Sequence, residues 1–331
     1  MEKRDVIVAG AGPAGLSAAL YSRIDGWDTL LLEGSWAGGQ GAIAYTVSNY
    51  PGFPPGDGAA LMQNMTAQVT SPPPTGVGAE LKYEKVTRID SNDMIVTTEK
   101  NNYQAKAIIL ATGSIMQQLH IQGEDEFSGK GVSYYAQRDA DKFAGKRVLV
   151  IGGGNTTAKS ALLAKKTAES VTLIHRREAL RTYPVMTKKL QMEGVTIMYN
   201  SEVSAIKGTS HVESVSVIDN NTGVSQELPV DWVIICVGTQ PDNSLAANAG
   251  LAMEGQYVKV NNKLMTSVEG IFACGEITGC ERHLITAASD GSLAGMAASE
   301  YLALQMLSEG RTFEGAKNGK YADEYLAMLH G

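Results

Sequence analysis

Two segments of the chain carry the same glycine spacing between an apolar run and an alanine-rich helical pattern. The first reads RDVIVAGAGPAGLSAAL, and the second, KRVLVIGGGNTTAKSALLA, has Gly152, Gly154 and Thr157 at the equivalent positions. A strand, a glycine turn and a helix in this order form a dinucleotide-binding unit, in which the helix amino terminus faces the pyrophosphate. The chain is therefore predicted to contain two nucleotide-binding folds in tandem. Thr157 in place of a third glycine is expected to loosen the contact between helix and strand slightly.

The residue that closes each unit differs in charge. Glu33 ends the second apolar run of the first unit, 18 residues after the last motif position, and His175 stands at the same distance in the second unit. A carboxylate there accepts hydrogen bonds from ribose hydroxyls and repels a 2′-phosphate. Three arginines follow His175, namely Arg176, Arg177 and Arg181. Because arginine binds phosphate through paired hydrogen bonds, the first unit is predicted to take an unphosphorylated adenosine and the second NADP. The alternative for HRREALR is a solvated basic helix start.

Composition and charge narrow the classes of function. The 331 residues suffice for two domains, and a net charge of -7 with a pI near 5.4 argues against a nucleic-acid partner. The amino-terminal apolar run contains glycine and proline and lacks a small-residue cleavage site, and no segment approaches the length of a membrane span. We therefore expect a soluble, cytoplasmic protein. Cys236, Cys274 and Cys280 form neither a CxxC pair nor a zinc-ligand pattern, so no metal is expected.

The motifs together resemble the low-molecular-weight thioredoxin reductases of the FAD/NAD(P) disulfide-oxidoreductase superfamily. Further landmarks are GGQ at 38–40, NYPGFP from Asn49, ATG at 111–113, VGTQPD and FACGEI, and the resemblance covers residues 5 to about 309. It implies an α/β fold with two Rossmann-like, three-layer ββα dinucleotide-binding domains of the FAD/NAD(P)-binding disulfide-oxidoreductase type. It also implies FAD in the first domain, NADPH in the second and a homodimer. Residues 1–115 and 243–331 would form the FAD domain around an inserted NADPH domain, residues 116–242.

The fingerprints and the resemblance assign residues to each cofactor. Those expected to hold FAD are Gly10, Gly12, Pro13, Ala14, Gly15, Glu33, Gly39, Gln40, Asn49, Ala111, Thr112, Gly113, Gly275, Glu276, His283 and Leu284. Those expected to hold NADPH are Gly152, Gly154, Asn155, Thr156, His175, Arg176, Arg177 and Arg181. Glu276 stands where the family usually has the aspartate that holds the ribityl chain, and the additional methylene is expected to shift that contact.

The dithiol of the resembled family is missing. Where that family carries Cys-Ala-Thr-Cys-Asp, this chain has the segment YAQRD from Tyr135 to Asp139. Tyrosine and arginine cannot undergo thiol–disulfide exchange, which requires a thiolate, so the dithiol mechanism is excluded. No catalytic residue is assigned. Tyr135, Arg138 and Asp139 are candidates, and the simplest interpretation is that Asp139 pairs with Arg138.

Other residues leave alternatives open for the flavin face. A redox pair of Cys274 and Cys280 is conceivable, but Cys274 lies in an apolar strand, where a free thiol behaves as a small hydrophobe, and Cys236 is expected in the core. Aromatic residues that could cover the flavin are Tyr134, Tyr135, Tyr321, Tyr325 and His330. The alternative for the carboxy-terminal segment is a helix packed on the surface or on the dimer partner.

Three functions remain in competition. The leading hypothesis is a reductase of an electron-carrier protein of the ferredoxin or flavodoxin type, which is supported by intact nucleotide motifs and a lost dithiol. Such carriers are acidic, and the lysines of AKKTAES and TKKLQ could supply the basic patch that they need. The second is a reductase of a small molecule such as a quinone, free flavin, oxygen or a low-molecular-weight disulfide. The third is a non-enzymatic flavin-bearing sensor with a vestigial NADPH site, for which Thr157 and Lys159 give some support.

Overall fold

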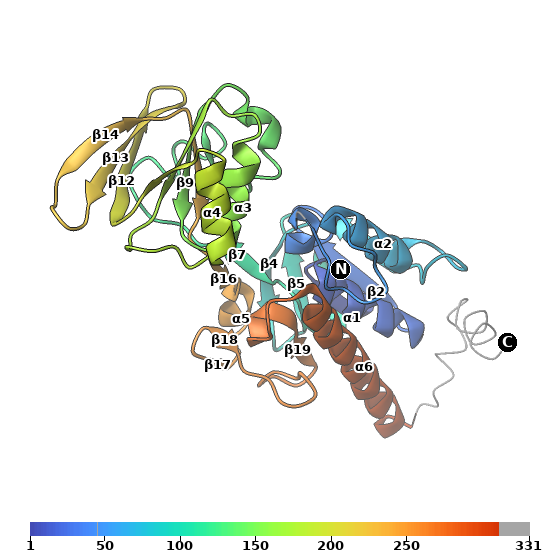
Figure 1. The fold of residues 1–331 in the computed structure, drawn as a ribbon. Coiled ribbons are helices and arrows are strands. Elements are labelled where there is room, and N and C mark those ends of the chain that lie inside the picture. The colour runs from blue at the N-terminus through green and yellow to red at the C-terminus, as the bar shows by residue number, and fades with distance from the viewer. Residues whose placement is uncertain (45, 311–331) are drawn as a thin grey trace. The chain divides into compact units, whose positions relative to one another are not determined.

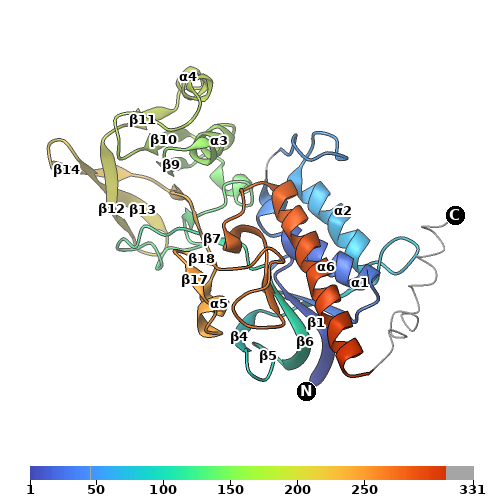
Figure 2. The ribbon, with the colours of Figure 1, turned by 90° about the horizontal axis from the view of Figure 1, so that it is seen from below.

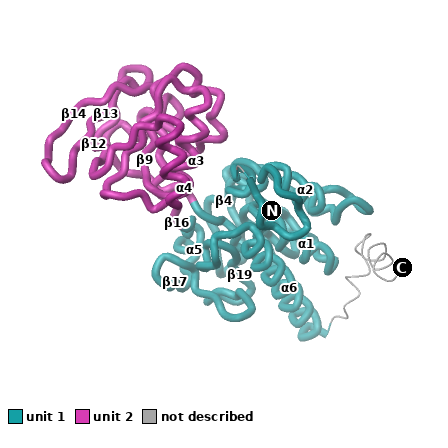
Figure 3. Tube along the Cα trace, in the orientation of Figure 1, with its two compact units in different colours: residues 1–114, 241–331 teal, residues 115–240 magenta. Residues whose placement is uncertain are grey.

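The computed structural model describes residues 1–44 and 46–310, and the chain divides into two compact units. Unit 1 consists of Met1–Ser114 and the segment that returns at Pro241, and unit 2 is Ile115–Gln240 (Figure 3). The first boundary lies one residue, and the second two residues, before the predicted positions. Which cofactor each unit binds stays a prediction at this point.

Unit 1 is built on a mostly parallel sheet. In spatial order its strands are β3 (Glu80–Tyr83), β2 (Thr29–Glu33), β1 (Glu2–Ala9), β6 (Asn102–Leu110), β5 (Ile95–Thr98) and β4 (Val86–Asp90), with β19 (Ile271–Ala273) beside the end of β6. The strands β3, β2, β1, β6 and β19 run parallel, whereas β5 and β4 are antiparallel to their neighbours. Parallel strands buried on two faces read as continuous apolar runs, which explains the sequences VIVA and AIIL.

Helices cover one face of this sheet and shorter elements cover the other. The helices are α1 (Pro13–Ile24), α2 (Gly58–Thr70) and α6 (Leu284–Ser308), and Figure 2 shows α1 and α6 side by side. A Cβ on Gly291 would lie 1.9 Å from the carbonyl oxygen of Ala14, so the two helices meet backbone to backbone. The opposite face packs on α5 (Ser244–Asn248) and on the hairpin of β17 (Met253–Glu254) and β18 (Tyr257–Val258). Short 3-10 turns, Gly39–Ile43 and Gly275–Thr278, follow the sheet at its carboxyl edge.

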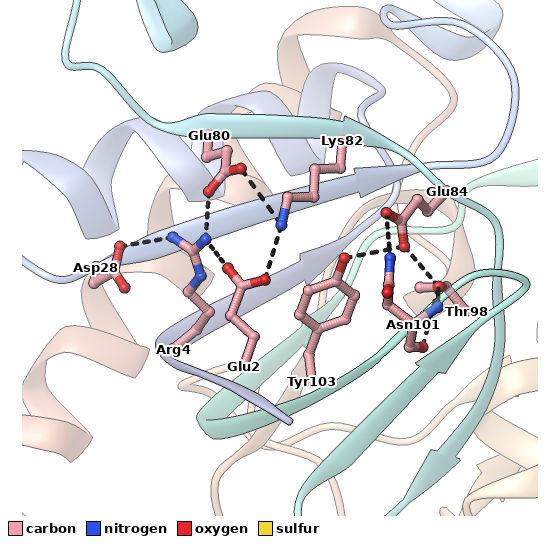
Figure 4. A network of polar contacts seen from close by, with 9 residues as sticks. All are labelled: Glu2, Arg4, Asp28, Glu80, Lys82, Glu84, Thr98, Asn101 and Tyr103. Carbon is pink, nitrogen blue, oxygen red and sulfur yellow. Dashed lines mark hydrogen bonds and ion pairs between the residues drawn. The ribbon is translucent and has the colours of Figure 1, made fainter.

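A charged network ties the amino ends of β1, β2 and β3 (Figure 4). The Arg4 guanidinium pairs with Glu2, Asp28 and Glu80, and Lys82 bridges Glu2 and Glu80. Arginine is suited to this role because its planar fork serves several carboxylates at once. The network lies at the sheet edge opposite the predicted nucleotide site.

A second polar group lies beside it in Figure 4 and is centred on the buried carboxylate of Glu84. Glu84 accepts hydrogen bonds from Thr98 at 2.7 Å, and from Asn101 and Tyr103 at 3.0 Å. Burial raises the pKa of Glu84, but the hydrogen bonds outweigh it and the pKa is lowered. The carboxylate therefore holds the β5–β6 turn against the end of β3 as a satisfied buried charge.

Unit 2 has three layers. Its parallel sheet has the order β11 (Thr196–Met198), β10 (Ser170–Ile174), β9 (Arg147–Gly152), β15 (Trp232–Cys236) and β8 (Val132–Ser133). One face packs on α3 (Asn155–Ala164), α4 (Pro184–Met192) and the 3-10 turn Ala140–Phe143. The other packs on the antiparallel sheet of β12 (Ser201–Gly208), β13 (Val212–Asp219) and β14 (Ser225–Pro229).

Alternate residues of each strand in unit 2 enter different cores. In β9, for example, Val148 and Val150 face the helices while Leu149 and Ile151 face the antiparallel sheet. The predicted α/β class with three-layer ββα units is confirmed (Figure 1). The chain passes between the units through β7 (Ser114–Met116) and β16 (Thr239–Pro241), which pair with each other. Within residues 1–44 and 46–310 we find no helix with the length and apolarity that a membrane crossing requires.

Candidate functional site

The first glycine turn is shaped by close backbone contacts on one side and open space on the other. Gly10 has φ +106°, and a Cβ there would lie 2.3 Å from the oxygen of Ala111; a Cβ on Gly15 would lie 1.8 Å from the oxygen of Gly10. Gly12, in contrast, has nothing within 4 Å of its Cβ position, and it precedes α1 as an N-cap without a side-chain hydrogen bond. The turn therefore leaves helix N–H groups available beside an open space, as a pyrophosphate site requires.

Glu33 lies over this turn. Its carboxylate accepts the backbone N–H groups of Ala11 and Ser35, each at 2.9 Å. The Ala11 carbonyl in turn accepts the N–H of Gly38 at 2.7 Å, which brings the GGQ segment to the turn. The carboxylate predicted to meet a ribose is thus oriented by the backbone before any ligand arrives.

Other predicted FAD residues converge on the same edge of the sheet. A Cβ on Gly39 would lie 3.3 Å from the Cα of Gly12, and one on Gly275 would lie 3.0 Å from the Cβ of Ala14. Pro13 is the first residue of α1, and Thr112 donates to the carbonyl oxygen of Asp242 at 2.6 Å. The turn, the GGQ segment, the ATG segment and the FACGEI segment therefore meet in unit 1.

Ser114 was missed by the sequence analysis. Its hydroxyl donates to the carboxylate of Glu276 and accepts from the side-chain amide of Gln40 at 2.8 Å. Ser114 directly follows the ATG segment, and this position was the only sequence signal that could have pointed to it. Glu276 thus contacts Ser114, and the effect of its longer side chain on the ribityl contact stays a prediction.

The segments around Asn49 and the start of α6 also approach each other. Asn49 Nδ2 lies 3.5 Å from Nδ1 of His283, the N-cap of α6. Leu284 reaches to within 3.2 Å of the Cβ position of Gly41, next to Gln40. These contacts join the two outermost segments predicted to hold FAD.

The second glycine turn repeats the first with one change. A Cβ on Gly152 would lie 2.3 Å from the Cys236 oxygen, and Gly154 has nothing within 4 Å. Thr157 is buried, and its hydroxyl donates to the Cys236 carbonyl at 3.2 Å and accepts the Gly154 N–H at 3.3 Å. The expected loosening is wrong, because the threonine hydroxyl ties helix, turn and strand together. Asn155 and Thr156, which lie between Gly154 and Thr157, are exposed at the start of α3.

The side chain of His175 is placed differently from that of Glu33, because it packs under the second glycine turn. His175 is 5% exposed, and its ring lies so close to the turn that a Cβ on Gly153 would be 2.2 Å from the ring Cε1. Burial and the charge of Arg181, followed by the other arginines, lower the pKa of His175, so the ring is neutral at pH 7. Arg181 donates its backbone N–H to the Gly153 carbonyl at 2.7 Å, so the basic segment folds back over the turn. The side chains of Arg176, Arg177 and Arg181 are exposed there.

The segment from Tyr135 to Asp139 forms a closed charge cluster. The Arg138 guanidinium lies 4.9 Å from the centroid of the Tyr135 ring and 3.3 Å from the Asp139 carboxylate. Asp139 is buried and also accepts from Ser133 and, at 2.8 Å, from Lys142. Burial raises the pKa of Asp139, but the three hydrogen bonds lower it further than burial raises it. The expected pairing of Asp139 with Arg138 is confirmed.

The cysteines are free thiols with little thiolate character. Burial raises the pKa of Cys236 to about 11, and burial with Asp290 nearby raises that of Cys280 to about 12. Burial also raises the pKa of Cys274, which is fully buried. Because the thiolate is the reactive form, these values argue against redox chemistry by Cys274 and Cys280. Cys236 is partly buried against the core, where its thiol meets Ser160.

The aromatic candidates differ in how firmly they are held. Tyr134 is half-buried and donates its hydroxyl to the buried carboxylate of Glu124 at 2.6 Å, while Tyr135 carries the Arg138 guanidinium on its ring. Tyr321, Tyr325 and His330 lie outside the described residues, so their role stays a prediction.

Comparison with known proteins agrees with this geometry. The chain belongs to the pyridine nucleotide-disulphide oxidoreductase family, whose profile matches residues 4–292. Within that family it is similar to the thioredoxin reductase of Treponema pallidum, with 38% identity over 90% of this chain and 97% of the relative. The crystal structure of Lactococcus lactis thioredoxin reductase superimposes with a TM-score of 0.81 at 31% identity, over 91% of this chain and 99% of that one.

A third similar protein is named after ferredoxin. It is a ferredoxin-flavin thioredoxin reductase from Clostridium acetobutylicum, with a TM-score of 0.51 and 26% identity over 92% of this chain and 99% of that one. The chain is therefore a thioredoxin reductase-like flavoprotein oxidoreductase, an FAD-dependent enzyme of the NAD(P)H class. Thioredoxin reductases use FAD and NADPH, the two cofactors that the motifs predicted.

Proposed function

We propose that this enzyme passes electrons from NADPH through FAD to an acceptor outside the chain, without a protein dithiol, and that the acceptor is an electron-carrier protein of the ferredoxin or flavodoxin type. The observation that carries the proposal is the cluster of Tyr135, Arg138 and Asp139. Its cation, ring and carboxylate satisfy one another where the relatives' chemistry requires two thiols. Bound FAD would supply the redox chemistry, because a flavin can take a hydride and release electrons singly or in pairs.

The side chains of unit 2 account for the choice of NADPH. Arg176, Arg177 and Arg181 are exposed beside the second turn, and their guanidinium groups bind the 2′-phosphate. The open side of Gly154 at the amino end of α3 receives the pyrophosphate. Neutral His175 fills the space beneath the turn, so that no carboxylate opposes the phosphate at the position equivalent to Glu33.

The side chains of unit 1 account for FAD. Glu33, already oriented by the N–H groups of Ala11 and Ser35, accepts the hydroxyls of the adenosine ribose. Gly12 leaves room for the pyrophosphate, and Gln40 and Glu276 face the ribityl chain. Asn49, His283 and Leu284, which approach one another and the segment of Gln40, would hold the flavin ring.

The basic segments of unit 2 support an acidic carrier as the acceptor. In a protein of net charge -7, Lys166 is exposed just after α3, and Lys188 and Lys189 are exposed on the neighbouring helix α4. Val185 and Met192 are 70% and 87% exposed on the same face of α4. Lysines around exposed apolar side chains are suited to an acidic protein surface, because opposite charges steer the encounter. The similarity to the Clostridium acetobutylicum protein, whose name includes ferredoxin, supports the same class of partner.

Anaerobic stopped-flow absorbance tests the proposal. The flavin band of the purified enzyme is expected to bleach rapidly with NADPH and slowly with NADH. Reoxidation is then expected with ferredoxin or flavodoxin but not with thioredoxin. Turnover with quinone or oxygen that exceeds turnover with the carriers would favour the small-molecule reductase, and no bleaching by either nucleotide would favour the sensor.

A charge-reversal pair tests the docking surface. Lys188→Glu with Lys189→Glu is expected to slow reoxidation by the acidic carrier about tenfold at low salt, without a change in bleaching by NADPH. The matched control reverses two exposed lysines elsewhere on unit 2, Lys130→Glu with Lys146→Glu. An equal loss in the control would reveal an effect of net charge alone.

The proposed homodimer is supported by an apolar stripe on α6. Ile285, Leu293, Met296, Leu304 and Leu307 are 37% to 59% exposed and recur at helical spacing on one side of the helix. Exposed apolar side chains gathered on one side of a helix are typical of a protein interface. Sedimentation of Leu293→Glu with Leu304→Glu against the unmodified protein tests it, with a shift to monomer expected.

A further inference from the structure

Ser114 joins two side chains that the sequence places far apart. Gln40 lies in the first 3-10 turn, Glu276 lies in the turn after β19, and Ser114 is the last residue of unit 1 before the chain enters unit 2. The Ser114 hydroxyl donates to Oε2 of Glu276. The Gln40 amide nitrogen lies 2.8 Å from the Ser114 hydroxyl and 2.8 Å from the Ser114 carbonyl oxygen.

These hydrogen bonds use every side-chain donor of Gln40, Ser114 and Glu276. A glutamine amide has two N–H groups, and the Ser114 oxygens take the two; a serine hydroxyl has one O–H, and Glu276 takes it. The groups that remain are acceptors, namely Oε1 of Gln40 and Oε1 of Glu276. Two acceptors side by side repel a phosphate and match a ligand that presents several hydroxyl donors. Within FAD, that ligand is the ribityl chain.

We propose that Ser114 is a positioning residue for FAD, which orients Glu276 and Gln40 so that their free oxygens accept hydroxyls of the ribityl chain. The inference rests on the proposed assignment of Gln40 and Glu276 to FAD. It also explains the glutamate at position 276, where the resembled family has aspartate. The longer glutamate side chain makes the contact with the Ser114 hydroxyl in this chain.

Reconstitution of the apoprotein with FAD, followed by quenching of flavin fluorescence, measures the effect. Ser114→Ala is expected to weaken FAD binding about tenfold to a hundredfold, because a hydrogen bond to a charged group is lost and Glu276 is released. Ser114→Thr keeps the hydroxyl and is expected to bind within about threefold of the unmodified protein. Ser292→Ala is the matched control, since Ser292 is on α6 and donates only to the Ser289 carbonyl.

A double-mutant cycle separates positioning from simple stability. Ser114→Ala and Glu276→Ala are expected to be non-additive, with the double variant losing less than the sum of the two single losses, because part of the effect of Ser114 passes through Glu276. If Glu276→Ala weakens FAD binding while Ser114→Ala does not, the role of Ser114 is wrong and the FAD assignment stands. If neither variant weakens FAD binding, the assignment of Glu276 to FAD fails, and the inference fails with it. Loss of affinity in Ser114→Thr equal to that in Ser114→Ala would also overturn it, since rescue depends on the hydroxyl.

Discussion

The two nucleotide units share one register and differ in the side chains placed on it. In unit 1, Ala9, the residue before the first glycine, pairs with Leu32, which precedes Glu33. In unit 2, Ile151 pairs in the same way with Ile174, which precedes His175. Glu33 and His175 therefore hold equivalent backbone positions, although their side chains lie differently. In the proposed function the glycine turns place the nucleotide, and the side chains at and after this register position select it.

An ion pair at the amino end of each sheet is repeated with its polarity reversed. In unit 1, Asp5 of β1 pairs with Lys106 of β6 at 2.7 Å; in unit 2, Arg147 of β9 pairs with Asp231, just before β15, also at 2.7 Å. The strand registers make the two pairs equivalent. Both units thus place opposite charges on adjacent parallel strands at this position, with the order of the signs exchanged.

At the third motif position the two units differ in how the helix contacts the glycine turn. Gly15 lets the α1 backbone rest on the Gly10 carbonyl, whereas Thr157 fills the equivalent space and bonds to Cys236 and Gly154 through its hydroxyl. A contact that is steric in unit 1 is therefore a hydrogen-bonded one in unit 2.

The largest loss of stability is expected from substitutions at the third motif position. Gly15→Ala places a Cβ 1.8 Å from the Gly10 oxygen, so it is expected to cost about 3 kcal/mol or more and to leave the protein without flavin. Thr157→Ala leaves the Gly154 N–H and the Cys236 carbonyl with one partner fewer and is expected to cost about 1–2 kcal/mol. Urea unfolding and flavin content measure the two variants. Equal costs would show that the third position is equally constrained in the two units.

The next effect concerns the nucleotide rather than the fold. Arg177→Ala with Arg181→Ala is expected to raise the Kd for NADPH about a hundredfold, because two charge-assisted contacts to the 2′-phosphate are lost. The Kd for NADH should change less than about twofold, since NADH lacks that phosphate. Titration calorimetry gives the two constants, with Arg88→Ala in unit 1 as the control for removing an exposed arginine. An equal loss for NADPH and NADH would contradict the assignment of the arginines.

The sequence predicted what depends on periodicity and could not predict what depends on distant contacts. The strands around Gly10 and Gly152 and the equivalence of Glu33 with His175 follow from local patterns, and they were confirmed. The bonds of Thr157 depend on Cys236, which is remote in the chain, so the motif alone suggested a looser helix. Ser114 was missed for the same reason, because its partners come from two other segments of unit 1.

The smallest change in unfolding free energy is expected from the two ion pairs of reversed polarity. It compares equivalent positions of the two units directly. Asp231 accepts three hydrogen bonds from Arg147, which lower its pKa to about 2. Asp5 pairs with a lysine that is 51% exposed and accepts the backbone N–H of Asp28 at 3.1 Å. Asp231→Asn is expected to cost about 1–2 kcal/mol at pH 7 after solvent screening is allowed for, and Asp5→Asn less than about 0.5 kcal/mol.

The pH dependence of the Asp231 variant has a definite sign. A carboxylate whose pKa is lowered by folding stabilises the protein above its ordinary pKa near 4, and this stabilisation is lost as the pH falls toward about 2. The gap in unfolding free energy between the unmodified protein and Asp231→Asn should therefore be full at pH 7 and close as the pH approaches 2. Denaturant unfolding at a series of pH values measures it. A gap that stays constant with pH would mean that Arg147 and Asp231 stabilise unit 2 by packing rather than by charge, and the equivalence of the two ion pairs would then be one of position only.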